Sequence, residues 1–387
     1  MKGRTLFKQL GIIALVLVTV ALVVAACGGT TATTQTSATT VVPNTTASST
    51  PASSETTAAP GTETTATSST ATTVGLGDYK GIDKGFITEL PQPTVDTSKQ
   101  FTVGFLLNNG AVGTLVAIEK AAQAQVESMG GKFIGYDAAT DAQKQVSQMD
   151  QLISQKVDAI IAYSVTDATL TQGIQSAAKA GIPVIQVEVP TNPATPLNAG
   201  AISLVTIDHD VGCYETMKYI SEQTPGAKLA FMKYGLPNEA IGYILDRARY
   251  WAQQFKLTIF PDEGSAINPS PAAASDAAQS ILAKHPDANY IVAFNDVSAN
   301  ATAKVLSAAG NTSIKVITPN CGDALTVPLI QDGSVTCVWS GPYVKLGQQV
   351  AIAAYDAITK QGTLPERVMV LGQLATKDNV DSVTFVK

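Results

Sequence analysis

The sequence predicts an α/β protein with two lobes, each built around a parallel sheet, that are joined by a hinge. Short apolar segments rich in β-formers alternate with longer segments whose apolar residues recur at helical spacing. This alternation pauses once, in the Pro-, Asn- and Thr-rich stretch 188–201, and then resumes. Residues 74–387 make a folded region about twice as long as a typical domain, which leaves room for two lobes.

The first half of this region contains four predicted strands and three predicted helices. The strands are residues 101–107, 132–136, 158–163 and 182–187, and the helices are 114–129, 141–155 and 168–180. Gly130, Gly131 and Gly181 end two of the helices, as glycine commonly does. Strands joined by helices imply right-handed crossovers and a parallel sheet, and their apolar character indicates that helices cover both faces.

The second half repeats the alternation. The predicted helices are residues 211–223, 239–256, 271–284, 298–309 and 343–360. The predicted strands are 228–232, 258–260, 290–294, 314–318 and 335–339, with two late candidates at 368–371 and 383–386. We expect lobe one to hold residues 101–208 and about 341–366, and lobe two to hold 209–340 and 367–387.

Residues 1–26 have the features of an export signal. Lys2, Arg4 and Lys8 precede an apolar run, which ends in small residues before Cys27. This stretch resembles a bacterial lipobox, whose cysteine becomes the lipidated first residue of the mature protein. An uncleaved membrane anchor and a simple secretory signal are the alternatives. We therefore expect an extracytoplasmic protein whose membrane partner is reached through a lipid anchor at Cys27.

Residues 27–73 follow as a predicted disordered tether. They consist mostly of Thr, Ser, Ala and Pro, and their only charged residues are Glu55 and Glu63. Such a segment cannot bury enough apolar surface to offset the entropy lost on ordering. We interpret it as a spacer that holds the folded region away from a membrane or through a wall layer.

The composition narrows the possible partners. The chain is 45% hydrophobic with a net charge of −6, and it has no Lys/Arg cluster beyond the first residues, so we expect no nucleic-acid partner. Cys213, Cys321 and Cys337 leave an odd number of later cysteines. A disulfide between Cys321 and Cys337 is one possibility, because both lie near the ends of neighbouring predicted strands; three buried free thiols are the other.

The sequence argues against an enzyme. It has two histidines, His209 and His285, and it lacks a His-Glu-x-x-His pair, a Gly-x-Ser-x-Gly elbow and a phosphate loop. His209 stands between Asp208 and Asp210, which could make a catalytic or metal site, but we interpret it as a surface turn histidine. We expect no catalytic residue, no metal and no cofactor.

Polar side chains follow most of the predicted strands, and ligands of open parallel sheets bind beyond the carboxyl ends of strands. These side chains are Asn108, Asn109, Thr166, Asp167, Glu188, Lys233, Tyr234, Asn295, Asp296, Asn320, Cys321, Asp323, Trp339 and Ser340. Amides, carboxylates and aromatic rings together suit a polyhydroxylated ligand. The structural alternatives are helix caps for Asp167, Asp296 and Ser298, and a turn for Asn109.

Several segments together carry a family resemblance. They are Gly-Phe-Leu-Leu-Asn-Asn at 104–109, Ala-Gly-Ile-Pro-Val-Ile at 180–185, Ile-Val-Ala-Phe-Asn-Asp at 291–296, residues 151–161, 208–212, 285–286 and 331–333, and Arg247. From residue 101 to the C-terminus, the chain resembles class I periplasmic binding proteins of the ribose-binding type. The resemblance implies two Rossmann-like lobes that close on a small-molecule ligand, and an ABC transporter permease as partner.

The resemblance also implies site residues. Asn109, Asp167, Arg247 and Asn295 fall on ligand positions of the family. Four other family positions differ, because an aromatic pair is replaced by Ala111 and Val112, an aspartate by Cys321 and a glutamine by Gly341. Ribose itself therefore does not follow, and another sugar, a polyol or a similar metabolite is expected. The further candidates for ligand contact are Cys321, Trp339, Trp251, Tyr163, Tyr234 and Glu188, although tryptophans in such positions belong to the core more often than to a ligand site.

Two other functions share parts of this evidence. The same fold can present its ligand to a membrane receptor or kinase as a sensor, and the sequence does not separate this from import. An exported enzyme is the second alternative, and the absence of catalytic motifs disfavours it. A cytoplasmic repressor is disfavoured by the export signal and by the lack of a helix-turn-helix before residue 101.

Overall fold

The computed structural model describes residues 86–387, apart from 97, 167, 236–237, 262–263, 267–269 and 362. The predicted signal peptide, Cys27 and the tether lie outside this part of the chain, and so does the predicted ligand residue Asp167. None of the helices in the described ranges is long and apolar enough to cross a membrane.

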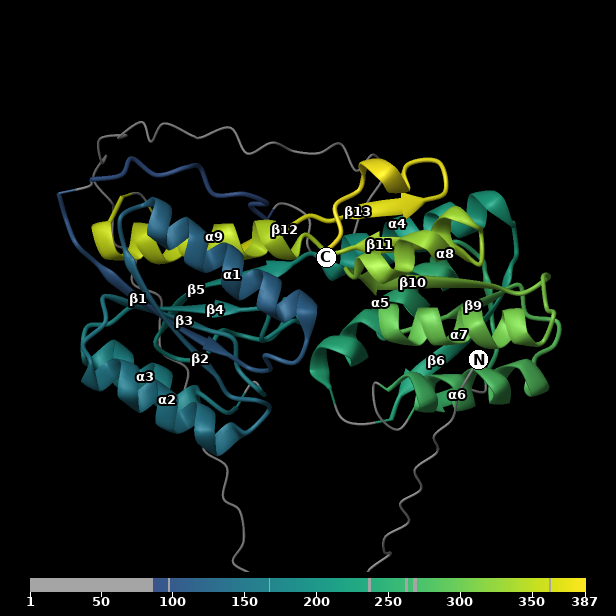
Figure 1. Cartoon of the computed structure of the whole chain (residues 1–387), viewed down its shortest axis with the longest axis horizontal. Coiled ribbons are helices and arrows are strands. Elements are labelled where there is room, and N and C mark those ends of the chain that lie inside the picture. The colour runs from purple at the N-terminus through teal and green to yellow at the C-terminus, as the bar shows by residue number, and fades with distance from the viewer. Residues whose placement is uncertain are drawn as a thin grey trace, which may run out of the picture. The chain divides into compact units, whose positions relative to one another are not determined.

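The first lobe is built on a six-stranded parallel sheet with the order β12-β5-β4-β3-β1-β2 (Figure 1). Its strands are β1 Thr102–Leu107, β2 Lys132–Asp137, β3 Ala159–Ala162, β4 Val184–Val187, β5 Ala201–Ile207 and β12 Arg367–Val370. Helices α1 (Gly113–Ser128) and α9 (Tyr343–Thr359) cover one face, and α2 (Ala142–Ser154) and α3 (Thr171–Lys179) cover the other. Consecutive residues of β1 point into separate cores on the two faces, as the apolar strands predict.

The second lobe is built on a seven-stranded sheet whose main path has the order β13-β11-β10-β9-β6-β7, with β8 paired to β6. Its strands are β6 Lys228–Tyr234, β7 Thr258–Ile259, β8 Gly264–Ala266, β9 Tyr290–Val292, β10 Lys315–Cys321, β11 Val335–Ser340 and β13 Gln373–Thr376. Its helices are α4 His209–Gln223, α5 Glu239–Gln254, α6 Pro271–Lys284, α7 Asp296–Ala308 and the short α8 Val327–Gln331, with 3-10 turns at Ala324–Thr326 and Val380–Ser382. The predicted fold class, two α/β lobes with parallel sheets, is confirmed.

The chain passes between the sheets three times, and these crossings form the hinge. They lie between β5 and α4, between β11 and α9, and between β12 and β13. The third crossing corrects a predicted boundary, because β12 pairs with β5 in the first sheet, whereas the sequence placed residues from 367 onward in lobe two. Strand β12 follows α9, which packs on β3, β4 and β5, and it joins their sheet and not the sheet of β11.

The C-terminal segment also differs from the prediction. Strand β13 was not foreseen, and it runs antiparallel to β11. The predicted strand at 383–386 makes a single bridge, between Val386 and Asp323. Both segments are short and mixed in polarity, so they lack the apolar run that marks a strand buried on both faces.

The three described cysteines, Cys213, Cys321 and Cys337, are buried and form no disulfide, so the alternative of three buried thiols is confirmed and the possible Cys321–Cys337 pairing is contradicted. Strands β10 and β11 are neighbours, but Cys337 is in register with Ile317, and Cys321 is in register with Ser340. At about 3.3 Å per residue, this offset separates the two cysteines by roughly 10 Å along the strands. A disulfide needs Cα atoms within about 7 Å of each other.

Asp356 on α9 gives a test of stability against pH. Burial raises the pKa of this carboxyl from 3.8 to about 6. In the folded protein, Asp356 therefore takes up its proton at a higher pH than in the unfolded chain. As the pH falls from above 6 towards 3.8, the cost of burying its charge disappears and the free energy of unfolding rises.

We expect Asp356→Asn to raise the free energy of unfolding by about 1 kcal/mol near pH 7.5, because the substitution removes a buried charge. Near pH 4 the parent carboxyl is mostly protonated, and the difference should shrink to a few tenths of a kcal/mol. Urea unfolding at both pH values measures this, with the exposed Asp150→Asn as control. A gain of the same size at both pH values would contradict the assignment.

Candidate ligand site between the two lobes

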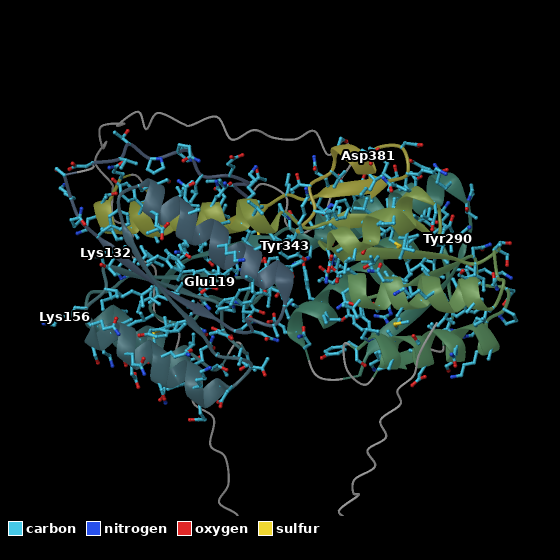
Figure 2. All side chains as sticks on the ribbon, in the orientation of Figure 1. Glu119, Lys132, Lys156, Tyr290, Tyr343 and Asp381 are labelled. Atoms are coloured by element: carbon cyan, nitrogen blue, oxygen red, sulfur yellow. The ribbon has the colours of Figure 1, made fainter. Side chains whose placement is uncertain are left out.

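Five side chains from the two lobes meet where the sheets face each other, and we call them the central cluster: Tyr163, Glu188, Asp296, Cys321 and Tyr343. Burial raises the pKa of Tyr343 well above its usual value, and the charges of Asp296 and Glu188 raise it further. The amide of Gly322 donates to Oδ2 of Asp296 at 3.3 Å, and a Cβ added to Gly322 would lie 2.1 Å from the Tyr343 ring, so Asp296, Cys321 and Tyr343 are close neighbours. Figure 2 shows Tyr343 at the point where the two lobes meet.

The cluster is assembled from the carboxyl ends of strands. Tyr163 and Glu188 directly follow β3 and β4 of lobe one, while Cys321 ends β10 and Asp296 begins α7 in lobe two. Tyr343 is the first residue of α9, just after the second crossing. The position therefore agrees with the rule that open parallel sheets bind ligands beyond their strand ends.

The lobes touch each other in this structure. The backbone amide of Asn192 in lobe one donates a hydrogen bond to Oε1 of Glu239 in lobe two, at 3.2 Å. The hydroxyl of Tyr343 donates to Oδ1 of Asn320 at 3.4 Å. A Cβ added to Gly322 would lie 2.1 Å from the Tyr343 ring, so this close approach requires glycine. The two lobes are therefore in contact beside the crossings.

Arg247 is held by a buried carboxylate. Its Nε donates to Oδ1 of Asp210 at 2.5 Å, and the same oxygen accepts a hydrogen bond from Nε1 of Trp251 at 2.7 Å. Burial lowers the pKa of Arg247, but the hydrogen bond and the charge of Asp210 outweigh this and raise it. The guanidinium also lies over the ring of Tyr250, with its carbon 4.2 Å from the centroid. Arg247 is thus fixed and charged on the inner side of α5.

Asn109 has the turn role that its structural alternative predicted, and Asn295, in place of the predicted Asp296 or Ser298, caps α7. The side-chain oxygen of Asn109 accepts from the amide of Ala111 at 3.0 Å and closes a turn. The side-chain oxygen of Asn295 accepts from the amide of Ser298 at 2.9 Å and caps α7. Neither bond uses the side-chain nitrogen. Both residues remain partly exposed at the strand ends of their lobes.

Both carboxylate oxygens of Glu188 contact residues at the first crossing. Its Oε1 accepts from the amide of Ile207 at 2.6 Å, and its Oε2 lies 3.0 Å from Nε2 of His209. Its φ of 59° is in the left-handed region, which costs energy for a residue with a side chain. His209 is only 4% exposed, so its prediction as a surface histidine is wrong. Glu188 therefore ties β4 to the hinge.

The two tryptophans lie in the core, as the structural alternative stated. Trp251 is 6% exposed and packs in the core of lobe two, where Asp210 accepts its indole hydrogen. Trp339 is 1% exposed, and its indole donates to Oε2 of Glu215 at 3.0 Å. The predicted role of either ring as a ligand surface does not fit this burial. Cys321 is equally inaccessible at 1% exposure.

The two tyrosines among the candidates are better placed. Tyr234 ends β6, is partly exposed, and lies with its ring 5.4 Å from that of Phe294, directly before Asn295. Tyr163 follows β3, and its carbonyl accepts a hydrogen bond from the buried side chain of Gln145 at 2.8 Å. Gln145 also binds the amide of Val165, so α2 holds the loop that leads towards residue 167.

A family model described as a periplasmic binding protein domain matches residues 103–362. The chain belongs to this family. Membership confirms the predicted fold and makes the chain a binding protein and not an enzyme. The geometry described above is therefore the geometry of a binding site, and no reaction has to be derived from it.

Two curated relatives of this binding protein are named as binding proteins for sugar import. The ribose import binding protein RbsB of Bacillus subtilis (strain 168) is 23% identical over 262 residues, which cover 67% of this chain and 82% of RbsB. The fructose import binding protein FruE of Bifidobacterium longum (strain NCC 2705) is 26% identical over 248 residues, 63% of this chain and 75% of FruE.

Solved structures of solute-binding proteins share the fold. A protein from Mycobacterium smegmatis with bound glycerol matches with a TM-score of 0.64 and 23% identity, over 75% of this chain and 100% of its own. A protein from Agrobacterium vitis bound with alpha-D-tagatopyranose matches with a TM-score of 0.65 and 18% identity, over 74% of this chain and 100% of its own.

Sequence reasoning missed Tyr343 in this binding protein. The available signal was an aromatic residue that follows Gly341 and Pro342 at the start of a helix. A Cβ at Gly341 or Gly322 would contact the Tyr343 ring, so two glycines far apart in the chain make room for it. That relation is spatial, and the sequence by itself does not show which aromatic residue fills the space.

Proposed function

We propose that the protein is an extracytoplasmic lipoprotein that captures a sugar or polyol by hinge closure and delivers it to an ABC importer. The observation that carries the proposal is that Tyr163, Asp296 and Tyr343, polar and aromatic residues from both lobes, lie at strand ends where the lobes touch. The relatives named for ribose and fructose import, and the structures with bound glycerol and tagatopyranose, support this ligand class.

The proposed ligand residues are Asn109 and Asp167 from lobe one, and Arg247 and Asn295 from lobe two. Amide and carboxylate groups suit a ligand that presents several hydroxyls, and a fixed guanidinium offers paired donors. Tyr343 supplies a ring face for the apolar side of the ligand, in place of the aromatic pair that the sequence lacks.

The lobes close because the ligand makes contacts with both of them. A ligand that binds both lobes has a higher affinity for the closed form, so it shifts the population towards that form. The three crossings act as the pivot. Glu188 holds the start of the first crossing through the amide of Ile207, and Trp339 holds the start of the second through Glu215. The closed shape is then what an importer can recognise.

Thermal-shift measurements on the full-length protein in mild detergent, with sugars, polyols and nucleosides, test the proposal. At a ligand concentration about a hundred times Kd, binding should stabilise the folded state by about 2.7 kcal/mol, a shift of several degrees. A sugar or polyol should give this shift, and nucleosides should not. A shift with nucleosides alone would contradict the ligand class.

The lipid anchor has its own test. We expect Cys27→Ser to abolish incorporation of labelled fatty acid and to release the protein from the membrane fraction, because the modified residue is lost. Cys213→Ser, at a buried position of the folded region, is the control and should keep both properties. Continued labelling of the Cys27→Ser protein would contradict the lipoprotein proposal.

A further inference from the structure

A hollow of about 620 Å³ lies at the hinge, and we call it the hinge hollow. The first helical turns of α4 and α9, the second and third crossings, the C-terminal segment and residues 88–92 all contribute to its lining. Tyr343 of the central cluster lines it, whereas Asn109, Arg247 and Asn295 do not. Its volume is within the range of small-molecule sites.

The charges that line the hinge hollow do not balance. Glu89, Glu215 and Lys345 line it, and Lys345 is already paired with Glu89, with 2.7 Å between Nζ and Oε2. Glu215 accepts a hydrogen bond from Trp339, whose indole is a neutral donor. Among the lining residues, no cation pairs with Glu215, and Lys218 outside the lining supplies the nearby positive charge.

The environment of Glu215 favours a cationic partner. Burial raises the pKa of its carboxyl, while the hydrogen bond from Trp339 and the charge of Lys218 act in the opposite direction. A half-buried carboxylate gains most from a positive charge at hydrogen-bond distance, since water screens the pair poorly there. The uncharged lining includes the amides of Gln348 and Gln373 and the apolar Phe385, which suit a short organic chain.

We propose that the hinge hollow binds a small organic cation whose ammonium group pairs with Glu215. Glu215 and Phe385 belong to lobe two, and Lys345 and Gln348 belong to lobe one. A molecule that contacts both lobes favours the lobe arrangement in which the hollow has this shape. The hinge hollow is therefore a second ligand site, coupled to closure by its position.

Isothermal titration of the full-length protein in detergent, without any sugar, tests this site. The probes are 1,4-diaminobutane and 1,4-butanediol, which have the same chain length and differ in charge. We expect the diamine to bind and the diol to bind at least about tenfold more weakly, as the loss of a charge-assisted hydrogen bond implies. Equal binding of both probes, or binding of neither, would overturn the proposal.

Variants locate the binding. Glu215→Gln keeps an oxygen that can accept from Trp339 and removes the charge, so it should weaken diamine binding at least about tenfold. Glu222→Gln, exposed on the same helix, should leave it unchanged. Gln348→Lys, exposed on α9, adds a cation beside the hollow and should also weaken binding. Diamine binding that is unaffected by Glu215→Gln and Gln348→Lys would refute the site.

The coupling is measured separately. A sugar titration with and without saturating diamine should show a severalfold rise in sugar affinity, because both ligands favour the closed form. This arm alone depends on the proposed function. If no sugar binds, the diamine titration still decides whether the hinge hollow is a site.

Discussion

Replacing Arg247 with alanine should weaken binding of the cleft ligand by about a hundredfold, because a fixed guanidinium loses its charge-assisted hydrogen bonds to the ligand. The same change should lower the free energy of unfolding by about 3 kcal/mol, since it leaves the fully buried Asp210 without its cationic partner. Thermal shifts and urea unfolding of the full-length protein measure the two effects. Loss of stability without loss of affinity would limit Arg247 to a structural role.

Two further variants separate these effects. Arg247→Lys keeps a cation for Asp210 but loses the planar fork, so we expect it to restore most of the stability and little of the affinity. Arg249→Ala removes a guanidinium from the same helix, where the side chain lies over the ring of Phe231, 4.7 Å from its centroid. It should keep the ligand-induced shift of the parent. Ligand binding by Arg247→Ala equal to that of the parent would contradict the site assignment.

Replacing Gly347 with alanine should destabilise lobe one by about 3 kcal/mol. Gly347 lies where α9 crosses α1, and an added Cβ would stand 2.2 Å from the backbone carbonyl of Ile118 and 2.8 Å from the Cβ of Ala121. Backbone atoms of a packed helix cannot move aside as a flexible side chain does, so the helices must separate. Urea unfolding of the full-length protein measures the loss.

Gly242→Ala is the matched control. Gly242 also lies in a helix, α5, but an added Cβ there would have no atom within 4 Å. We expect this change to stabilise the protein by about 0.5 kcal/mol, as alanine favours helix over glycine. The two substitutions are chemically identical, so opposite signs isolate the contact between α1 and α9. Equal effects at both positions would rule out close packing at Gly347.

The fold could be predicted because its strands are buried on both faces. Residues 101–107 and 158–163 appear as continuous apolar runs, and helices of regular spacing follow them. β13 could not be found this way, since only part of the strand is buried. The cysteine pairing failed for a related reason. Sequence order indicates that β10 and β11 are neighbours, but the register that separates Cys321 from Cys337 depends on packing.

Site residues could be predicted from the sequence only where they lie at the end of a predicted strand. Asn109, Tyr234 and Asn295 lie where the strand pattern placed them. The partner of Arg247 is Asp210, 37 residues earlier in the chain, and no local pattern connects the two. Tyr343 enters the central cluster through a crossing between lobes, and Trp251 and Trp339 are buried by tertiary contacts. Side chains whose role depends on contacts between distant segments were therefore missed or misassigned.

A crystal structure of the full-length protein with the sugar or polyol that gives the largest thermal shift tests the central claim most directly. Our account predicts that the ligand lies between the lobes, in contact with Asn109, Asp167, Arg247 and Asn295 and against the ring of Tyr343. A ligand that does not contact Asn109, Asp167, Arg247 and Asn295, whether it lies in the hinge hollow or on another surface, would contradict it.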